Sequence, residues 1–569
     1  MSTFNKRRRS FILIALVILA PFIFLSTTDK DFKIAKNLDI FVTLFREVDL
    51  YYVDEKDPEN LINSSIQGML ESLDPYTTYI AESEMDDFKF MTTGQYGGIG
   101  ALIRKGGDYT IISEPYEDFP AQKAGLQAGD TILSIDGIST KDKDISQVSD
   151  MLKGTPNTEL TLQIKRFGNS SILEKTFTRE QITIKNVPYS GMVNIDIGYI
   201  RISNFTKNAS KEVRKAFTEL KELGAKSIII DLRGNPGGLL NESVEIANIW
   251  VEKGQEIVST RGKAKQWDNT YITEKPALDT SIPLAVLVNR GSASASEIVA
   301  GSLQDLDRAI VVGQRTFGKG LVQTTRPLSY NTHLKITTAK YYIPSGRCIQ
   351  ALDYTHRNED GSVGYIPDSL ISEFSTKNGR TVYDGGGIRP DVSVDLPQPG
   401  NITYSLYANN YIFDFATYFA AENSTIESPE LFQVTDEIYT EFIRFVKDKD
   451  FEYSIESNEK LNELIESTKR EGYYKLAENE IAGLKTKLVA DKENDLITFQ
   501  DEIKEILAEE IVSRYYYQSG RIITSLKNDP QLEKTVELLK EPGAFSSILN
   551  GTYDGGDIKL ALEKVKIAQ

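Results

Sequence analysis

The residues of this chain best suited to covalent chemistry are serines at the junction of an apolar strand and a helix. The apolar segment 284–288 is followed by the run Gly291-Ser292-Ala293-Ser294-Ala295-Ser296-Glu297, which leads into a helix expected over 294–306. A hydroxyl at such a junction lies beside N-terminal helix amides that have no acceptor within the helix. Because these amides can stabilise an oxyanion, the segment predicts nucleophilic attack on a carbonyl group.

A serine nucleophile needs a base, and Lys319 is the candidate that the sequence offers. The only two histidines, His333 and His356, stand in no metal-ligand spacing and in no recognisable catalytic motif. Lys319 is flanked by Gly318 and Gly320, with apolar residues just beyond. If the fold buries this lysine, desolvation lowers the ammonium pKa, and the neutral amine can accept the serine proton.

Spacing alone leaves Ser292 and Ser296 as rivals of Ser294. In a helix that begins near Ser294, Ser292 comes before the helix and Ser296 points about 200° away, so at most one of the three hydroxyls faces the base. Glu297 lies one turn from Ser294, and Asp305 follows at the helix end. We expect both carboxylates either to orient the site by hydrogen bonds or to serve the fold alone.

The composition bounds the class of protein around this site. A chain of 569 residues with 40% hydrophobic residues should fold into three or four globular domains. Its 65 basic and 82 acidic residues give a net charge of −17, which disfavours nucleic acid as a partner. The single cysteine, Cys348, excludes an intrachain disulfide and a cysteine zinc site. We expect no metal and no cofactor.

The N-terminus reads as an export signal. Four basic residues at 6–9 precede an apolar run at 11–25, which polar residues follow. The run is shorter than the roughly 20 residues that span a bilayer comfortably, and Pro21 interrupts it. The sequence therefore predicts residues 1–30 as a signal peptide or a retained anchor in the inner membrane. The rest of the chain is then expected to be exported to the periplasm.

Hydrophobic periodicity divides the remaining chain into four regions. Residues 31–90 have helical spacing, and 91–183 show short strands punctuated by glycines. In residues 184–400, buried-type strands such as 228–230 alternate with helical stretches such as 239–250, which indicates an α/β core. Residues 401–569 have helical periodicity, so we expect a helical C-terminal domain that either mediates oligomers or binds an adaptor.

The glycine-rich start of the second region could bind a carboxylate. Consecutive small residues before a strand leave backbone amides open to an anion, and the strand edge can pair with an extended peptide. The later segment, 120–137, resembles the helix, turn and strand signature of PDZ domains. This resemblance implies recognition of protein C-termini by strand addition. It places the carboxylate loop at Tyr96, Gly97, Gly98, Ile99 and Gly100.

The serine and lysine segments together resemble the carboxyl-terminal processing (tail-specific) serine peptidases. In that family the middle serine is the nucleophile and the lysine of the second motif is the base, which implies Ser294 and Lys319 here. The resemblance adds Gln323 to the catalytic residues, and we expect the nearby Thr316 to position Lys319. Segment 231–238 matches a further family element, whose glycines Gly237 and Gly238 would form the oxyanion hole with the amide of Ala295.

Further matches to the family lie at 73–76, 341–347 and 386–391, so the resemblance covers about residues 40–395. It implies a multidomain α/β protein with a crotonase-like serine peptidase core. An N-terminal helical domain, a PDZ domain and a helical C-terminal domain would surround this core. The function expected is that of an exported endopeptidase that selects protein C-termini.

Two other functions stay open from the sequence. A catalytically silent periplasmic scaffold would bind peptides with the same fold, although Ser294, Lys319 and Gln323 are all present. Crotonase-like folds also act on acyl thioesters through backbone oxyanion holes. The expected export and the attached peptide-binding module argue against coenzyme A substrates.

Overall fold

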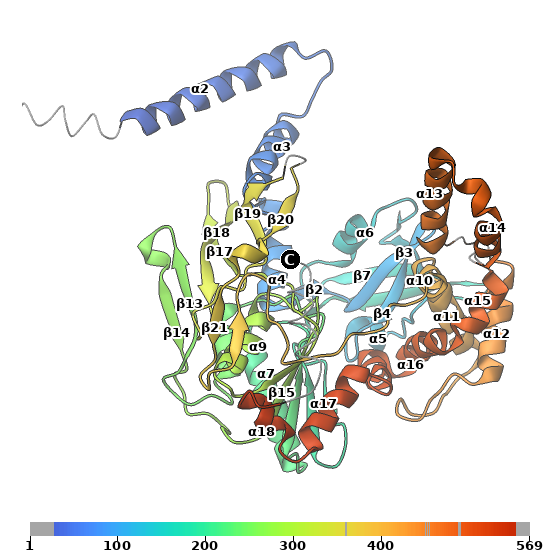
Figure 1. Cartoon of the computed structure of the whole chain (residues 1–569). Coiled ribbons are helices and arrows are strands. Elements are labelled where there is room, and N and C mark those ends of the chain that lie inside the picture. Colours follow the sequence, from blue (N-terminus) through green and yellow to red (C-terminus); the bar gives the residue numbers. More distant parts are fainter. Residues whose placement is uncertain are drawn as a thin grey trace, which may run out of the picture. The chain divides into compact units, whose positions relative to one another are not determined.

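The computed structural model describes residues 28–358, 361–449, 451, 453, 456–487 and 491–553 (Figure 1). The chain divides into two compact units, one ending at Tyr79 and the other beginning at Ile80. The expected signal or anchor at 1–30 lies almost wholly outside the described residues. Among the helices that the structure does describe, none has both the length and the apolar character needed to cross a bilayer.

The first unit contains two helices, as predicted, but they bury little apolar surface. They are α2 (Thr28–Tyr51) and α3 (Pro58–Glu71), followed by the short strand β1 (Thr78–Ile80). Asp57 begins α3 by accepting the amide of Glu59, and Pro58 occupies the first helical position. Large side chains of α2, such as Phe41 and Leu44, are exposed. The helical spacing therefore predicted the helices but not a core of their own.

The β-rich module forms an antiparallel sheet in the order β3-β4-β5-β7-β8, with β6 on β5 and a separate pair of β2 with β9. Strand β5 is the strand at the end of the segment 120–137, and a tight turn follows it. Asp136 and Gly137 both have positive φ, and Ile135 pairs with Ile138 across them, as a type I′ hairpin requires. The elements of this region are η1 (Glu82–Glu84), α4 (Met85–Thr93), β2 (Gln95–Gly98), β3 (Ala101–Gly106), β4 (Tyr109–Pro115), α5 (Pro120–Lys123), β5 (Thr131–Ile135), β6 (Ile138–Ser139), α6 (Ile145–Leu152), β7 (Glu159–Lys165), β8 (Ile172–Thr178) and β9 (Glu180–Thr183).

The α/β core is built on a sheet in the order β10-β11-β12-β15-β16-β23, parallel from β11 to β23. This confirms the α/β class and the two strands predicted at 228–230 and 284–288. The elements are β10 (Tyr189–Met192), β11 (Ile197–Arg201), α7 (Ala209–Glu222), β12 (Ser227–Asp231), α8 (Leu240–Ala247), β15 (Leu284–Val288), α9 (Ala295–Asp305), β16 (Ile310–Gly313) and β23 (Val392–Ser393).

Helices cover both faces of this sheet. Ile228 and Ile230 of β12 pack in the cluster that contains residues of α7, α8 and α9. Ile229, which points to the other face, packs with Leu532 and Ile548 of the C-terminal helices. Every residue of β12 is buried, which is why the strand reads as a continuous apolar run. Helices α17 and α18 thus complete the core.

A second sheet joins β17 (Leu321–Pro327), β18 (His333–Tyr342), β13 (Glu256–Gly262) and β14 (Asn269–Ile272) through antiparallel pairs. Shorter elements surround it: η2 (Lys265–Trp267), β19 (Leu352–Arg357), β20 (Val363–Tyr365), η3 (Asp368–Leu370), β21 (Glu373–Ser375) and β22 (Thr381–Tyr383). The β17–β18 hairpin follows directly after the segment that carries Lys319.

The C-terminal region is helical, as predicted. Its elements are α10 (Asn401–Ala408), α11 (Tyr411–Glu422), α12 (Asp436–Lys447), α13 (Glu456–Glu471), η4 (Tyr474–Leu476), α14 (Glu478–Lys487), α15 (Lys492–Thr498), α16 (Gln500–Ser525), α17 (Pro530–Lys540) and α18 (Ala544–Leu549). Arg521 of α16 pairs with Glu114 of the β-rich module at 3.0 Å, and Asp529 pairs with Arg233 of the core at 2.6 Å. The region therefore contacts both of them.

Asp231, at the end of β12, is the centre of a buried charge network. Its carboxylate accepts hydrogen bonds from the Tyr199 hydroxyl at 2.6 Å and from the Arg233 guanidinium at 2.6 Å, and Arg201 pairs with it at 2.6 Å. Burial alone would raise the pKa of Asp231, but Arg233 and Arg201 hold it well below its usual range. Through Arg233 the network continues to Asp529 of the C-terminal region.

We predict that Asp231→Asn lowers the free energy of unfolding by about 3–5 kcal/mol, because it leaves buried arginines without a counter-charge. The carboxylate stabilises the fold at pH values above the unfolded-state pKa of about 4, and this contribution is lost as the pH falls towards the lower folded-state pKa. Urea unfolding of both chains from pH 7 to pH 3 should show the difference shrinking. Asp196→Asn, which breaks an exposed pair with Lys226, should change stability by less than about 1 kcal/mol. Equal losses in the two variants would contradict this account.

Candidate active site

Three neighbouring parallel strands bring the predicted motifs to one edge of the core sheet. β12 ends at Asp231 and leads into 231–238, β15 leads into the serine segment, and β16 leads into the lysine segment. These strands are adjacent in the order β12-β15-β16. Because the carboxyl ends of parallel strands meet at the same edge, segments far apart in the sequence converge here.

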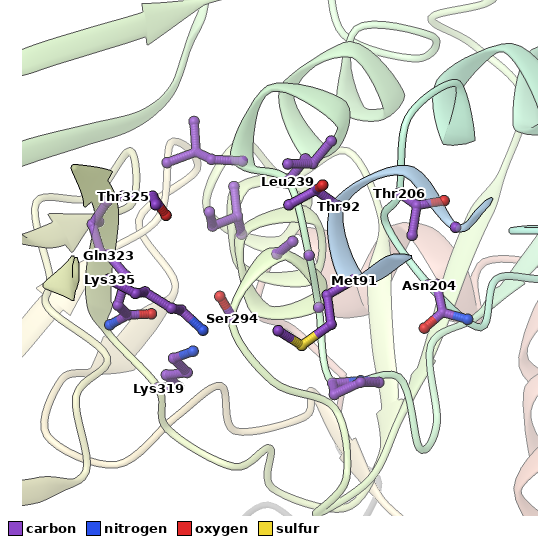
Figure 2. Close-up of a pocket in the computed structure, with 18 of the residues that line it drawn as sticks. Met91, Thr92, Asn204, Thr206, Leu239, Ser294, Lys319, Gln323, Thr325 and Lys335 are labelled. Atoms are coloured by element: carbon purple, nitrogen blue, oxygen red, sulfur yellow. The ribbon is translucent and has the colours of Figure 1, made fainter. Parts of the chain in front are cut away.

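Ser294 occupies the N-cap position of α9 in a strained conformation. Its φ of 55° and ψ of −112° lie outside the regions that residues with a Cβ ordinarily adopt. The residue is half-buried and lines a cavity of about 560 Å³ (Figure 2). A sharp strand-to-helix turn of this kind presents a hydroxyl to a cavity instead of packing it into the core.

The rival serines have structural partners. The Ser292 hydroxyl donates to the carbonyl of Leu232 at 2.9 Å, and the Ser296 hydroxyl donates to the carbonyl of Asn235 at 2.9 Å. Both side chains are completely buried, whereas Ser294 is the serine of this segment that lines the cavity. The structure thus separates three residues that spacing left equivalent.

Only some of the amides expected in the oxyanion hole are available as donors. The amide of Gly237 donates to Asn235 Oδ1 at 2.9 Å, so it is already occupied. Ala295 is the first residue of α9, and its amide has no acceptor within the helix. The amide of Gly238 donates to no backbone carbonyl in the described part of the chain. Gly238 and Ala295 therefore remain as the pair of available donors.

Gly237 contributes space instead of a donor. It has a φ of +99°, and a Cβ at this position would lie 2.9 Å from the amide nitrogen of Ala295 and 2.9 Å from the Cβ of Ser294. Any side chain here would displace the first turn of α9. Glycine thus allows the segment after β12 to approach the nucleophile segment closely.

Glu297 connects the serine and lysine segments. Its Oε2 accepts the amides of Ser294 at 2.8 Å and Lys319 at 2.9 Å. Its Oε1 accepts the Thr316 hydroxyl at 2.6 Å and the amide of Gly318 at 2.8 Å. Burial raises the pKa of this carboxyl, and the four donors oppose that rise. The contacts of Glu297 thus go to the backbones of both segments, and Thr316 shares the same carboxylate.

Lys319 and Gln323 line the same cavity as Ser294. Figure 2 shows the ammonium group of Lys319 directed towards the Ser294 hydroxyl, with Gln323 on the neighbouring strand β17. The Tyr341 hydroxyl donates to the carbonyl of Lys319, and Gln323 Nε2 donates to Thr337 Oγ1 at 3.2 Å. The structure therefore assembles Ser294, Lys319 and Gln323 around one space.

Asp305 does not reach this space. It lies at the opposite end of α9, about 16 Å along the helix axis from Ser294 at 1.5 Å per residue. There its carboxylate pairs with Arg347 at 2.7 Å and accepts the amide of Ser345 at 3.0 Å. These contacts hold the C-terminal end of α9. Asp305 is therefore too far from Ser294 to act in the site.

Several cavity residues were not anticipated from the sequence. Met91 and Thr92 come from α4, and Figure 2 shows them among the residues that line the cavity with Ser294. Lys335 comes from β18, opposite Thr325 of β17. Side chains alternate between the two faces of a strand, so a hairpin at 321–342 puts Lys335 on the same face as Gln323. This alternation is the sequence pattern that could have identified Lys335.

The predicted carboxylate loop lies at the start of the β-rich module. Tyr96 and Gly98 belong to β2, which pairs with β9, and the loop then passes through Ile99 and Gly100 to β3. Within the described ranges, the amides of Ile99 and Gly100 donate to no backbone carbonyl. β3 is an edge strand, because its strand partner in the sheet is β4. Open amides beside an open edge are the features that peptide addition requires.

Known proteins match three parts of the chain. Residues 196–356 match Peptidase family S41, residues 111–166 match the PDZ domain, and residues 402–539 match a family described as probable PDZ-protease, C-terminal helical domain. These matches confirm the predicted family resemblance and the PDZ domain. They also give the C-terminal helical region a family, which sequence reasoning did not supply.

Two relatives share about a third or more of their aligned residues with this chain. A carboxy-terminal-processing protease of Bartonella bacilliformis is 38% identical over 349 residues, which cover 61% of this chain and 79% of that protein. A probable CtpA-like serine protease of Staphylococcus aureus is 34% identical over 367 residues, covering 64% and 66%. Among solved structures, the photosystem II D1 C-terminal processing protease is 28% identical with a TM-score of 0.34, covering 63% of this chain and 93% of that one.

We predict that Glu297→Gln lowers kcat for cleavage of an unstructured peptide at least about tenfold and changes KM less than about twofold. The amide nitrogen of Gln cannot accept, so one pair of donors loses its acceptor: either the amides of Ser294 and Lys319, or the Thr316 hydroxyl and the amide of Gly318. The matched control is Glu242→Gln, because the Glu242 carboxylate also accepts two backbone amides, those of Asn208 and Ser210, away from the cavity. A kcat loss of similar size in both variants would reduce Glu297 to a general stabiliser of the fold.

Proposed function

We propose a specific reaction for this chain, which belongs to the carboxy-terminal-processing proteases of peptidase family S41 and is therefore a serine-type peptidase. In this proposal Ser294 attacks the carbonyl carbon of a substrate peptide bond and Lys319 is the general base. The observation that carries it is the strained Ser294 at the head of α9, in one cavity with Lys319. No other serine of the segment lines that cavity in the described chain.

The reaction proceeds through an acyl-enzyme. Lys319, as a neutral amine, takes the proton of the Ser294 hydroxyl while the oxygen bonds to the substrate carbonyl carbon. The amides of Gly238 and Ala295 hold the oxyanion, and the leaving amine departs with the proton from Lys319. Water then attacks the ester carbonyl while Lys319 takes its proton, and Lys319 returns this proton to the Ser294 oxygen as the bond to the acyl group breaks and the new carboxyl terminus leaves. Apolar side chains such as Leu321 and Ile298 line the cavity and favour the uncharged amine.

The PDZ domain selects the substrate by its free C-terminus. The amides of Ile99 and Gly100 would hold the terminal carboxylate, while the substrate pairs with the open edge of β3. Gly97 fits this loop, because a Cβ there would lie 2.0 Å from the carbonyl oxygen of Gly154. The Tyr96 hydroxyl accepts the amide of Ala101, the first residue of β3 after the loop. The captured chain is then threaded towards Ser294.

We further propose that the protein acts outside the cytoplasm. The basic residues at 6–9 and the apolar run at 11–25 support export, followed by cleavage of a signal peptide or by anchoring in the inner membrane. A periplasmic location agrees with a substrate range of protein C-termini. The proposed core is crotonase-like, with backbone amides as its oxyanion hole.

Ser294→Ala is expected to abolish cleavage of an unfolded protein that has an apolar C-terminus. Ser296→Ala should keep activity within about threefold of wild type, since it loses a structural hydrogen bond worth about 1 kcal/mol. Cleavage would be followed by mass spectrometry of the products, with circular dichroism as the folding control. Activity in folded Ser294→Ala, or its absence in folded Ser296→Ala, would remove Ser294 from the role of nucleophile.

Lys319→Arg should be as inactive as Lys319→Ala, because a guanidinium with a pKa above about 12 cannot act as a base at neutral pH. In the wild type, kcat/KM should rise with pH as the lysine loses its proton. The measurement is the pH profile of kcat/KM between pH 6 and pH 10 for one uncharged peptide. Substantial cleavage by Lys319→Arg, or a rate that falls over this range while the fold persists, would contradict the Ser/Lys mechanism.

A further inference from the structure

A second lysine faces the proposed active site from the β17–β18 hairpin. In this antiparallel pair Gln323 is opposite Thr337, and Thr325 is opposite Lys335. Successive side chains of a strand alternate between faces, so these four residues share one face of the hairpin. Gln323, Thr325 and Lys335 line the cavity of Ser294. Figure 2 shows the Lys335 side chain extending past Gln323 with its ammonium group directed towards Ser294.

Among the described residues that line the cavity, no acidic side chain matches the charge of this lysine. Of the cavity-lining residues that the structure describes, two are lysines and none is Asp or Glu. Within the described ranges, no carboxylate pairs with Lys335. The side chain is half-buried, and burial lowers the pKa of its ammonium group with no acidic neighbour to oppose the shift. A partly desolvated cation of this kind is stabilised when an anion enters beside it.

We propose that Lys335 is a specificity-determining residue that binds a carboxylate of the substrate close to the scissile bond. This inference rests on the proposed function, because it assumes that the cavity holds a peptide chain. The carboxylate is either an Asp or Glu side chain or the terminal carboxylate of a substrate that ends within a few residues of the cleaved bond. It is a carboxylate site distinct from the loop at Ile99 and Gly100.

The surroundings of the Lys335 ammonium group favour the recognition of charge. Thr325 is opposite Lys335 in the hairpin and lines the same cavity. Apolar side chains, among them Phe90 and Leu239, form much of the remaining wall. An ammonium group in such surroundings discriminates strongly between a carboxylate and its neutral amide, because the two differ in charge but hardly in shape.

The test uses matched peptides cleaved by the purified full-length chain. The parent peptide has no charged side chain. A single Glu or a single Gln is introduced at one position at a time on either side of the cleaved bond. Each of these peptides is made with a free and with an amidated C-terminus. The ratio of kcat/KM for Glu over Gln, at one position or more, should be at least about tenfold if the side chain binds Lys335. A preference of that size for the free terminus, confined to peptides that end close to the cleaved bond, would identify the terminal carboxylate as the ligand.

Three variants locate the preference. Lys335→Met should reduce the ratio of Glu over Gln to about one. Lys335→Glu should bring this ratio below one and should favour a matched peptide with Lys at the same position. The control is Lys340→Met, because Lys340 lies on the same strand but on its opposite, exposed face. This variant should keep the wild-type ratio. Thermal unfolding of each variant, and the shape of its pH profile on the uncharged peptide, complete the comparison.

The outcomes separate the inference from the proposed function. If the uncharged peptide is cleaved and Ser294→Ala is inactive, but acid and amide peptides are cleaved equally by the wild type, Lys335 binds no substrate carboxylate and the inference fails. It also fails if folded Lys335→Met keeps the wild-type ratio. Persistent cleavage by Ser294→Ala would instead overturn the proposed function.

Discussion

The site depends on one buried carboxylate, that of Glu297, which receives hydrogen bonds from the backbones of two separate segments. Ser294 and Lys319 stand 25 positions apart and follow different strands, yet their amides donate to the same oxygen of Glu297. The other oxygen receives the Thr316 hydroxyl and the amide of Gly318. Ser294 and Lys319, the proposed nucleophile and base, are thereby held through their main chains, which leaves both side chains for the cavity. Because four donors converge on a fully buried group, movement of either segment would leave polar groups unsatisfied.

The parallel sheet explains why this arrangement could be largely predicted. The strands at 228–230 and 284–288 are continuous apolar runs because helices cover both sheet faces. Once these strands are placed side by side, the segments after them must meet at one edge, and Ser294, Lys319 and Gly238 converge there. The turn at Asp136 and Gly137 depends on these two neighbouring residues alone. Such features depend on neighbours in the sequence or on adjacent strands, so the sequence contains them.

What could not be predicted depended on contacts between distant residues. Asn235 decides which glycine amide is available. Its side-chain oxygen accepts the amide of Gly237, which leaves the amide of Gly238. The separation of Ser294 from Ser292 and Ser296 required the carbonyls of Leu232 and Asn235. Lys335 was missed because its importance follows from the register of β17 on β18 and from the absence of acidic side chains among the described residues of the cavity wall. The packing of α17 and α18 on the core sheet likewise appears only in the folded chain.

The central claim, that Ser294 forms an acyl-enzyme with Lys319 as its base, is tested most directly by trapping the intermediate. The full-length chain would be mixed with a short peptide ester that has a good leaving group, quenched in acid within milliseconds to seconds, digested and sequenced by mass spectrometry. Fragment ions must distinguish the three serines, because they lie on one proteolytic peptide. The account predicts an acyl group on Ser294 in the wild type and a large loss of that adduct in Lys319→Arg. An acyl group on Ser292 or Ser296, or full labelling of Ser294 in Lys319→Arg, would contradict it.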